Sequence, residues 1–372
     1  MKTDEVIVSF RGVRKTYDGE TLVVKSLDLD IRRGEFLTLL GPSGSGKTTC
    51  LMMLAGFEFP TGGEIRLEGE LLNNVPPHKR NIGMVFQNYA LFPHLTVEQN
   101  VAYPLTVRKL PAGERAERVA HALKMVQMER FAKRYPAQLS GGQQQRIALA
   151  RALVFEPKLV LMDEPLGALD KQLREHMQYE LKALHEKLGV TFVYVTHDQG
   201  EALTMSDRVA VFDKGIVQQL DTVDRLYESP CNEFVANFIG DSNRLRGRVA
   251  RVDGEFCEFR LDDGTTLVGR NIGNAEAGAP AVACIRPERM SLALQHGSGH
   301  ANGHANGAAA NLLAGEARSL IYFGDHVRMR CAVPGQDECF VKVPLGTGAL
   351  DAFSPGAPVG LAFAPEHLRV FA

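Results

Sequence analysis

The feature that most constrains the fold is a glycine-rich stretch between a short apolar run and a helical segment. The run Glu35-Phe-Leu-Thr-Leu-Leu40 leads directly into residues 41–48, which match the pattern G-x-x-x-x-G-K-[ST] in full. Glycines in this pattern let the backbone curl so that its N–H groups point at phosphate oxygens, and the dipole of the following helix favours negative charge. The stretch therefore predicts a phosphate-binding loop within an α/β domain.

Two side chains of this loop are expected to act on a nucleoside triphosphate. Lys47 would reach the β- and γ-phosphates, and the hydroxyl of Thr48 would be a ligand of Mg²⁺. A glycine-rich turn that ends in Lys-Thr by chance is the alternative, but it leaves the flanking strand and helix unexplained. The predicted nucleotide-binding residues of the loop are Gly41, Pro42, Ser43, Gly44, Ser45, Gly46, Lys47, Thr48 and Thr49.

The first 240 residues alternate apolar runs with helical patterns. Continuous apolar runs of this length are typical of strands buried on both faces, so we predict a largely parallel sheet, with further strands near residues 82–86, 158–162, 190–195 and 208–212. The stretch from about residue 88 to about residue 157 is predicted to be a helical insertion. Within it, the apolar residues that follow helical spacing are Val119, Ala122, Leu123 and Val126.

A later apolar run, residues 159–162, ends in two carboxylates. A buried strand would present Asp163 to the metal ion, and Glu164 just beyond it would polarise an attacking water. An apolar strand that ends in Asp-Glu is common, and a surface strand terminus is the alternative. The catalytic interpretation of the pair is favoured because a phosphate-binding loop precedes it in the chain.

The pentapeptide Leu139-Ser-Gly-Gly-Gln143 distinguishes among classes of nucleotide-binding protein. It precedes a helical run over residues 144–153, and Ser140 can cap that helix while the two glycines permit close approach to an anion. An ordinary Ser-Gly-Gly cap is the alternative, but it requires neither the whole pentapeptide nor its position between the loop and the carboxylates. The predicted anion-contacting residues are Ser140, Gly141, Gly142 and Gln143.

With these motifs in this order, the chain resembles the nucleotide-binding subunits of ABC transporters. The resemblance implies a P-loop NTPase cassette and roles for four further residues. Gln87 resembles the Q-loop glutamine that senses Mg²⁺ and the membrane partner, and His197 resembles the switch histidine that contacts the γ-phosphate. Asp170 lies in a segment similar to the D-loop, and Tyr17 resembles the aromatic residue that stacks on adenine. Packing is the alternative for Tyr17, and a satisfied core histidine is the alternative for His197.

The same resemblance implies the cofactors and the assembly. Two copies would bind two ATP head to tail, with the loop of each copy facing the Ser140–Gln143 segment of the other. The chain carries one copy of each motif, so we predict a homodimer. The catalytic residues would be Lys47, Glu164 and His197, and the Mg²⁺ contacts would be Thr48, Gln87 and Asp163.

Two transmembrane permease subunits and, indirectly, a substrate-binding protein are the other partners that the resemblance implies. The permease would dock near residues 88–97, where Tyr89 and Phe92 are the aromatic side chains expected to be exposed. A hydrophobic turn that packs on its own domain is the alternative. The chain would then lie on the cytoplasmic face of the cell membrane as a peripheral subunit.

Residues 241–372 differ in texture from the cassette, with short β-rich segments punctuated by glycine, aspartate and proline. They predict a small OB-like barrel or sandwich, and they resemble the TOBE-type regulatory domain of binding-protein-dependent importers. An echo between residues 285–292 and 363–370 indicates two similar halves, and the Gly/His/Asn-rich residues 295–311 between them predict a flexible loop. Overall the chain most resembles the polyamine (spermidine/putrescine) branch, with iron(III) and sugar importers as alternatives.

Bulk properties agree with a cytosolic protein that binds no nucleic acid. The net charge is −2, the N-terminal residues lack the features of a signal peptide, and no apolar stretch has the length of a membrane span. The six scattered cysteines predict buried or free thiols. The alternatives of another class are a soluble ABC ATPase that acts on DNA or ribosomes, and a regulator whose output is the C-terminal domain.

Overall fold

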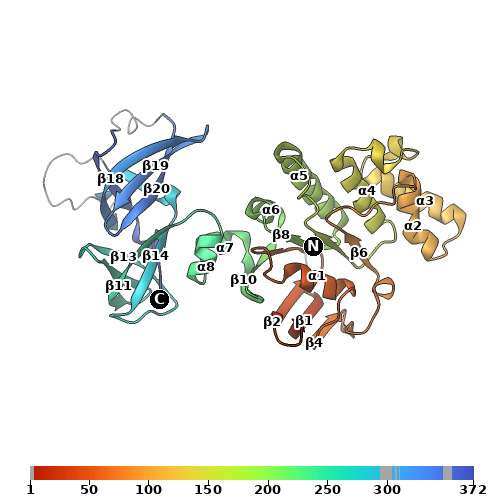
Figure 1. Cartoon of the computed structure of the whole chain (residues 1–372), viewed down its shortest axis with the longest axis horizontal. Coiled ribbons are helices and arrows are strands. Elements are labelled where there is room, and N and C mark those ends of the chain that lie inside the picture. The colour runs from red at the N-terminus through yellow and green to blue at the C-terminus, as the bar shows by residue number, and fades with distance from the viewer. Residues whose placement is uncertain (1–3, 294–303, 306–307, 310, 347–353) are drawn as a thin grey trace. The chain divides into compact units, whose positions relative to one another are not determined.

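The chain forms two compact units in a computed structural model that describes residues 4–293, 304–305, 308–309, 311–346 and 354–372. The first unit comprises Met1–Leu226 and the second Tyr227–Ala372 (Figure 1). The first unit mixes helices with two sheets, whereas the second is built mainly from strands. Among the described residues, no helix combines the length and apolar character needed to cross a membrane.

A six-stranded sheet forms the centre of the first unit, in the order β10-β9-β3-β8-β7-β6. All neighbours in it are parallel except β10 and β9, which are antiparallel. Every residue of β3 and of β8 is buried, which confirms the prediction of strands covered on both faces. The bounds are β3 Phe36–Leu40, β6 Ile82–Val85, β7 Leu159–Asp163, β8 Thr191–Thr196, β9 Arg208–Asp213 and β10 Ile216–Thr222.

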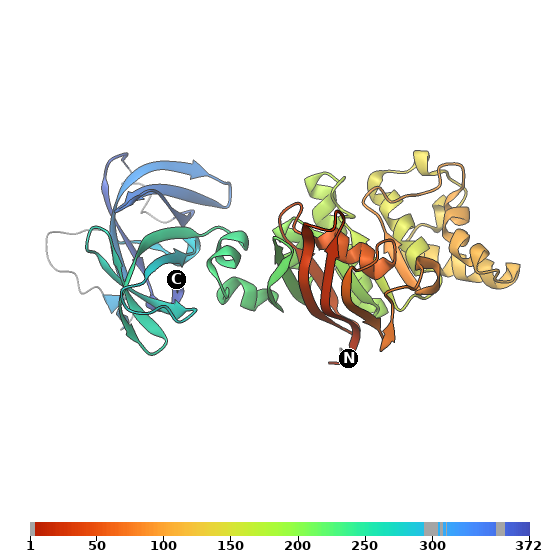
Figure 2. The same cartoon turned by 60° about the horizontal axis from the view of Figure 1, so that its bottom comes forward.

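A second, antiparallel sheet of order β2-β1-β4-β5 was not predicted from the sequence. Its apolar side chains share one core with helix α1 (Lys47–Ala55) and with the central sheet, so α1 is covered from both sides (Figure 2). Cys50 of α1 is buried in this core. The bounds are β1 Val6–Thr16, β2 Leu22–Arg32, β4 Gly62–Leu67 and β5 Glu70–Leu71.

Helices occupy the stretch between β6 and β7, as the spacing of apolar residues predicts. Their shared core contains Val119, Ala122, Leu123 and Val126, all buried. The bounds are α2 Val97–Val107, α3 Ala112–Met125, η2 Glu129–Phe131, η3 Pro136–Gln138 and α4 Gly141–Leu153. The helices α5 Lys171–Leu188, α6 Gln199–Met205 and α7 Val223–Glu228 come later in the chain, after β7.

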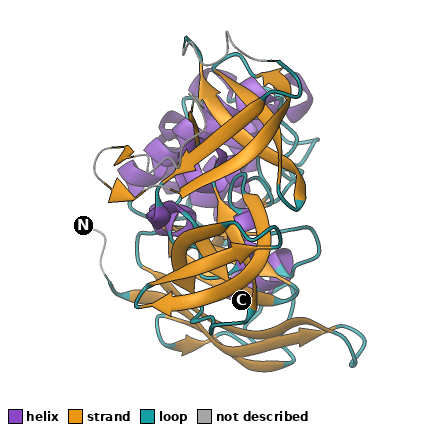
Figure 3. Cartoon of the chain, turned by 90° about the vertical axis from the view of Figure 1, so that its left-hand side faces the viewer, coloured by secondary structure: helices purple, strands orange, loops and turns teal. Residues whose placement is uncertain are grey.

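The second unit contains a closed five-stranded barrel and a five-stranded sheet that share one apolar core (Figure 3, strands in orange). The barrel strands are β11 Asn243–Asp253, β12 Phe256–Leu261, β13 Thr266–Ile272, β14 Pro280–Ile285 and β22 Arg369–Phe371. The sheet strands are β15 Ser291–Ala293, β18 Asn311–Tyr322, β19 His326–Val333, β20 Gln336–Pro344 and β21 Pro358–Phe363. The predicted β-rich domain is therefore confirmed.

The sequence echo corresponds to an exchange of short strands between the barrel and the sheet. The barrel strand β14 leads through the turn η4 (Pro287–Arg289) into β15, which pairs with β21 of the sheet. The sheet strand β21 leads through the turn η6 (Pro365–His367) into β22, which pairs with β13 and β14 of the barrel. Each half therefore supplies the other with one strand.

The Gly/His/Asn-rich segment at 295–311 lies largely outside the described residues. His304–Ala305 and Ala308–Ala309 pair as two short antiparallel strands, β16 and β17. Asn311, predicted as the end of the loop, instead begins β18 and is buried. Its side-chain amide exchanges two hydrogen bonds of 2.8 Å with the backbone of Val268, which explains why a polar residue is buried there.

The border between the two units differs from the predicted one at residue 240. Barrel strand β11 begins at Asn243, close to the predicted border, but the compact units divide at Leu226. Helix α8 (Glu233–Phe238) accounts for the difference, because its Ala236 shares a small apolar cluster with Cys284 and Phe371 of the barrel. The sequence change at residue 241 marks the first strand, not the border of the unit.

Candidate nucleotide-binding site

The loop between β3 and α1 adopts a conformation that only glycine allows at two positions. Gly46 has φ of 102°, and a Cβ atom there would lie 2.9 Å from the carbonyl oxygen of Val23. A Cβ atom on Gly41 would lie 2.3 Å from the carbonyl oxygen of Phe212. The loop is thus closely packed against neighbouring backbone, and the glycines of the pattern have a steric reason.

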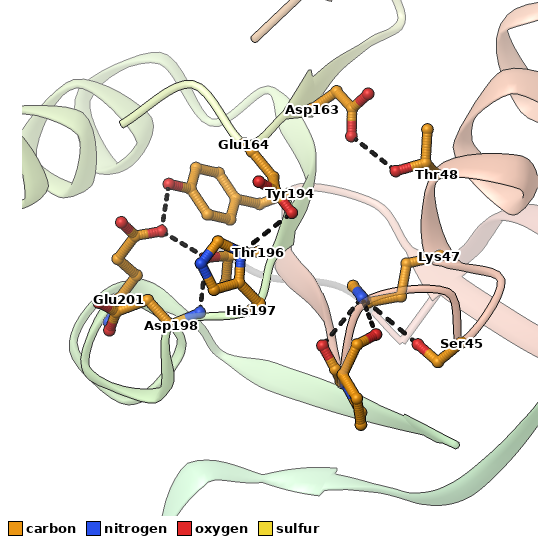
Figure 4. Close-up of polar contacts among 12 residues, drawn as sticks. Ser45, Lys47, Thr48, Asp163, Glu164, Tyr194, Thr196, His197, Asp198 and Glu201 are labelled. Atoms are coloured by element: carbon orange, nitrogen blue, oxygen red, sulfur yellow. Dashed lines mark hydrogen bonds and ion pairs between the residues drawn. The ribbon is translucent and has the colours of Figure 1, made fainter. Parts of the chain in front are cut away.

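Lys47 is buried within its own loop (Figure 4). Its Nζ donates hydrogen bonds to the carbonyl oxygens of Gly41 (2.9 Å) and Pro42 (2.8 Å) and to Oγ of Ser45 (3.3 Å). Burial lowers the pKa of the Lys47 ammonium, although the charges of Glu164 and Asp163 act in the opposite direction. The loop therefore holds a desolvated positive charge at its centre.

Thr48 and Asp163 meet at the end of β7. The hydroxyl of Thr48 donates to Oδ1 of Asp163 over 3.0 Å. Burial raises the pKa of the Asp163 carboxyl, whereas the hydrogen bond from Thr48 lowers it. A hydroxyl and a carboxylate are hard oxygen donors, and Mg²⁺ usually takes one or two carboxylates in addition to phosphate oxygens. The donor set therefore fits Mg²⁺.

Glu164 and His197 lie side by side because β7 and β8 are parallel neighbours that end at the same edge of the sheet (Figure 4). Nδ1 of His197 is 3.1 Å from Oε1 of Glu164. The backbone N–H of Glu164, which has φ of 43°, donates to the carbonyl oxygen of Val195 over 3.0 Å. The His197 side chain is largely exposed, so it is not a satisfied core histidine.

Three other predicted residues have distinct surroundings. Gln87 is exposed shortly after β6, and its Nε2 would lie 3.9 Å from a Cβ atom on Gly167. Asp170 caps α5 by accepting from the N–H of Leu173 over 3.0 Å. The ring of Tyr17 is 59% exposed, and its hydroxyl is 3.5 Å from Oγ1 of Thr49 at the start of α1, so the ring is accessible to a flat ligand.

The segment Ser140–Gln143 begins α4 in the helical part of the unit. Ser140 and Gln143 form a reciprocal capping box, with distances of 3.0 and 3.4 Å. A Cβ atom on Gly141 would lie 3.1 Å from Leu169, so this glycine also permits close packing on the segment before α5. Ser140 and Gly141 are exposed, so this helix start is accessible to an anion.

The prediction that Tyr89 is exposed is wrong. The residue is 5% exposed and belongs to the core of the central sheet. Its φ of 60° turns the side chain inward, and its carbonyl oxygen accepts from Arg151 over 2.7 Å. Phe92 is half-buried and packs on Tyr103, with ring centroids 4.5 Å apart.

Sequence reasoning missed a buried polar cluster behind His197. Glu201 is 3% exposed, and its Oε2 accepts from Thr196 (2.6 Å) and Tyr194 (2.8 Å) (Figure 4). Burial raises the pKa of the Glu201 carboxyl, and the two hydrogen bonds lower it. The sequence signal that could have indicated this cluster is a glutamate four residues after His197, at the start of a helix.

The fold and the arrangement of these residues define the class: an ATP-binding cassette ATPase with an appended β-domain. Two family models agree, one for the ABC transporter over residues 24–167 and one for the TOBE domain over residues 283–371. The chain belongs to the ABC transporter family of ATP-binding proteins. The resemblance inferred from the motifs is thereby confirmed.

Curated relatives match nearly the whole chain. A protein of Acidothermus cellulolyticus named spermidine/putrescine import ATP-binding protein PotA is 46% identical, with 97% of this chain and 92% of the relative covered. A protein of the same name from Pseudomonas fluorescens is also 46% identical, with 96% of this chain and 94% of the relative covered.

Solved structures match the cassette. A dimeric post-hydrolysis state of the ATP-binding cassette MJ0796 bound to ADP and Pi is 38% identical with a TM-score of 0.52. The match covers 58% of this chain and 98% of that structure. A cbiO1 structure from Clostridium perfringens is 29% identical with a TM-score of 0.56, covering 60% of this chain and 91% of that structure.

Proposed function

We propose that this ABC ATPase hydrolyses ATP in order to energise polyamine import through partner membrane subunits. One observation carries the ATPase part: Lys47, the Thr48–Asp163 pair and the Glu164–His197 pair gather at one edge of the central sheet. These groups supply, in one place, a phosphate cradle, a metal site and a means of polarising water.

The nucleotide would bind with its phosphates in the loop 41–48 and its adenine on Tyr17. Lys47 would exchange its bonds to the loop carbonyls for bonds to the β- and γ-phosphates. Thr48, Asp163 and Gln87 would hold Mg²⁺, which supplies charge neutralisation at the β- and γ-phosphate oxygens. The desolvated ammonium makes phosphate binding favourable because the buried positive charge gains an anionic partner.

Hydrolysis would be carried out by Glu164 and His197. Glu164 would orient and polarise the attacking water, and His197 would contact the γ-phosphate. The 3.1 Å contact between the two side chains supports Glu164 at this edge of the sheet. This pre-arrangement lowers the cost of ordering the carboxylate during the reaction.

A complete site would need a second copy of the chain. The Ser140 capping box presents the start of α4, and in the proposed dimer this helix start binds the γ-phosphate held by the partner's loop. The dimeric cassette structures to which the chain is similar support this arrangement. Loss of the shared γ-phosphate then favours separation of the halves and moves the membrane subunits.

The membrane partner would dock on a groove between α2 and α3. The groove has a volume of about 680 Å³, and its lining combines polar side chains such as Glu98, Arg115 and Glu129 with small and apolar ones, among them Leu95, Ala102, Ala116, Ala120 and Leu123. It begins within the segment where the sequence predicts permease docking. A short amphipathic helix of the permease is the occupant that such a groove fits, since a helix buries its apolar face in this way.

The cargo is proposed from the names of the relatives, which are polyamine import proteins. A peripheral position on the cytoplasmic face of the membrane and an indirect interaction with a substrate-binding protein follow from the same proposal. Reconstitution with the partner permease and binding protein tests it. Spermidine, but not iron(III) or a sugar, should stimulate ATP hydrolysis, whereas stimulation by DNA or ribosomes alone would contradict the transport function.

The variant Glu164→Gln tests the ATPase mechanism. It should bind MgATP, lose at least about 100-fold in kcat, and accumulate as a nucleotide-bound dimer, because only the water-polarising carboxylate is removed. Nucleotide binding, phosphate release and size-exclusion chromatography with ATP are the measurements. A fully active variant would refute the role of Glu164.

The variant Ala116→Arg tests the docking groove. An arginine on this exposed position would obstruct the groove, so assembly with the permease and transport should be lost while basal ATP hydrolysis is kept. Glu117→Arg is the matched control, since Glu117 is exposed on the same helix and does not line the groove. Equal co-purification of the permease with both variants would exclude this surface.

A further inference from the structure

Arg174 connects two parts of the site that are separated in sequence. It lies in the first turn of α5, where its Nη2 donates to the carbonyl oxygen of Leu169 over 3.0 Å. Its Nη1 donates to Oδ2 of Asp198 over 3.4 Å, and its Nε lies 3.9 Å from Oε1 of Glu201. One guanidinium thus spans the segment before α5 and the start of α6.

The acidic partners of Arg174 hold the backbone on both sides of His197. Glu201 accepts from Thr196, the residue before His197, over 2.6 Å. Asp198, the residue after His197, donates its N–H to Oγ1 of Thr196 over 3.0 Å and accepts from the N–H of Glu201 over 3.1 Å. The position of His197 is therefore determined by groups that Arg174 pairs with.

The other end of the connection reaches the start of α4. The side chain of Leu169 packs so closely on Gly141 that a Cβ atom there would lie 3.1 Å from Leu169 Cδ2. The carbonyl oxygen of the same Leu169 is the acceptor for Arg174. A shift of the α4 start would consequently be transmitted to the peptide that Arg174 holds.

We propose that Arg174, together with Glu201, is a positioning pair for hydrolysis that links the start of α4 to His197. The inference rests on the proposed ATP-bound dimer. There, the start of α4 serves the partner's ATP whereas His197 serves the ATP of its own loop. Arg174 therefore connects the two sites by direct contacts, with Leu169 on one side and Asp198 on the other, and it acts through other residues instead of on the nucleotide itself.

Two variants separate the ion pair from the rest of the cluster. Arg174→Met keeps an unbranched stem and removes the guanidinium. Glu201→Gln keeps a carbonyl oxygen that can accept from Tyr194 and Thr196 and removes the charge that faces Arg174. Each variant should lower kcat about tenfold, leave the KM for ATP within about twofold, and lower the Hill coefficient for ATP toward one.

The double variant Arg174→Met/Glu201→Gln should be no slower than the slower single variant, because residues that act as a unit are not additive. Arg174→Lys should restore part of kcat, since lysine keeps the charge but lacks the planar guanidinium that bonds several partners at once. Additive losses in the double variant would contradict a joint role.

Another ion pair of the same unit, in which the glutamate is again buried, provides the matched control. Nη1 of Arg208 is 3.2 Å from Glu35, which is 3% exposed, as Glu201 is. This pair lies at the amino-terminal ends of β3 and β9, at the opposite edge of the sheet from the site. Arg208→Met should lower the melting temperature at least as much as Arg174→Met while leaving kcat and the Hill coefficient unchanged.

The outcomes distinguish this inference from the proposed function. If the wild-type chain hydrolyses ATP but Arg174→Met keeps its kcat and Hill coefficient, the positioning pair is excluded. Equal losses of kcat in Arg174→Met and Arg208→Met would mean that the loss comes from lower stability alone. That result would also exclude the positioning pair. If the wild-type chain shows no ATP hydrolysis at all, the proposed function itself fails.

Discussion

Some residues of the site are energetically unfavourable in the free protein, and a bound ligand would relieve that cost. Asp163 is the clearest case, because burial raises its pKa and the neighbouring Glu164 adds to the rise. The ionised carboxylate is therefore less stable in the folded protein than in the unfolded chain. A bound cation would remove that penalty, so metal binding and stability are coupled at this residue.

This coupling gives a test with the variant Asp163→Asn. An acid whose pKa is raised by folding opposes folding when ionised, so removing the charge should stabilise the free protein at neutral pH by about 1 kcal/mol or less, because the group is partly solvated. The gain should shrink as the pH falls through the raised pKa. Urea unfolding at several pH values measures this.

In the same variant, the stabilisation by MgATP should be largely lost, because the carboxylate that faces the metal is gone. Thr48→Val, which removes the hydroxyl on the other side of the pair, is the companion variant. A free Asp163→Asn protein that is less stable than the wild type at neutral pH would contradict the interpretation.

The sequence points to some residues of the candidate site and not to others, for physical reasons. Lys47, Thr48 and Asp163 are recognisable because their chemistry requires a fixed spacing from a buried strand. Glu201 and Arg174 escape notice because a charged residue near a helix start is usually solvated, and only the fold brings their partners together. Tyr89 was assigned wrongly because its left-handed backbone, which turns it inward, leaves no sequence signal.

At the level of single elements, two helices of the first unit, α4 and α2, begin with the same kind of capping box. The N–H of Ser140 donates to Gln143 and the N–H of Gln143 to Ser140, over 3.0 and 3.4 Å. On α2, Thr96 and Gln99 form the same reciprocal pair, over 2.9 and 3.4 Å. The local stabilisation of the two helix starts should therefore be similar.

The two caps allow the structural and ligand-binding roles of Ser140 to be separated. Ser140→Ala and Thr96→Ala should each cost about 1 kcal/mol of unfolding free energy. ATP-dependent dimerisation of a Glu164→Gln background should be lost only with Ser140→Ala. Loss of dimerisation with both variants, or with neither, would show that the Ser140 cap has no special part in ATP binding.

Some strands are easier to predict from the sequence than others. The parallel strands of the central sheet fall close to the predicted runs, because burial on both faces demands continuous apolar sequence. The antiparallel sheet was missed because β1 and β2 alternate buried and exposed residues and pair with several register shifts. Each shift interrupts the period of two by which such strands are recognised.

For the whole molecule, the position of α8 decides where the cassette can be cut. Val235, Ala236 and Ile239 are buried in or just after this helix, and Ala236 packs on the barrel residues Cys284 and Phe371. A fragment that ends at residue 240 would retain α8 without the surface that covers it. A fragment that ends at residue 228 would keep α7 whole and leave α8 out.

The fragment 1–228 should therefore be more soluble and melt at a higher temperature than the fragment 1–240. If the cassette is the motor, both fragments should keep basal ATP hydrolysis. If the protein is instead a regulator that acts through its C-terminal unit, both fragments should lose that regulatory activity. Thermal unfolding, binding of a hydrophobic dye and phosphate release are the measurements. A more stable 1–240 fragment would support the border predicted from the sequence.

The exchange of short strands in the second unit has a consequence for biosynthesis. Strand β22 fills the gap between β13 and β14, yet it is translated after every strand of the neighbouring sheet. While the ribosome is still making that sheet, the cylinder stays open along two unpaired edges, which can recruit other nascent chains. If translation stops before Arg369, the released polypeptide lacks β22, and its barrel keeps the two unpaired strand edges. Such a product is a natural target for chaperones and proteases.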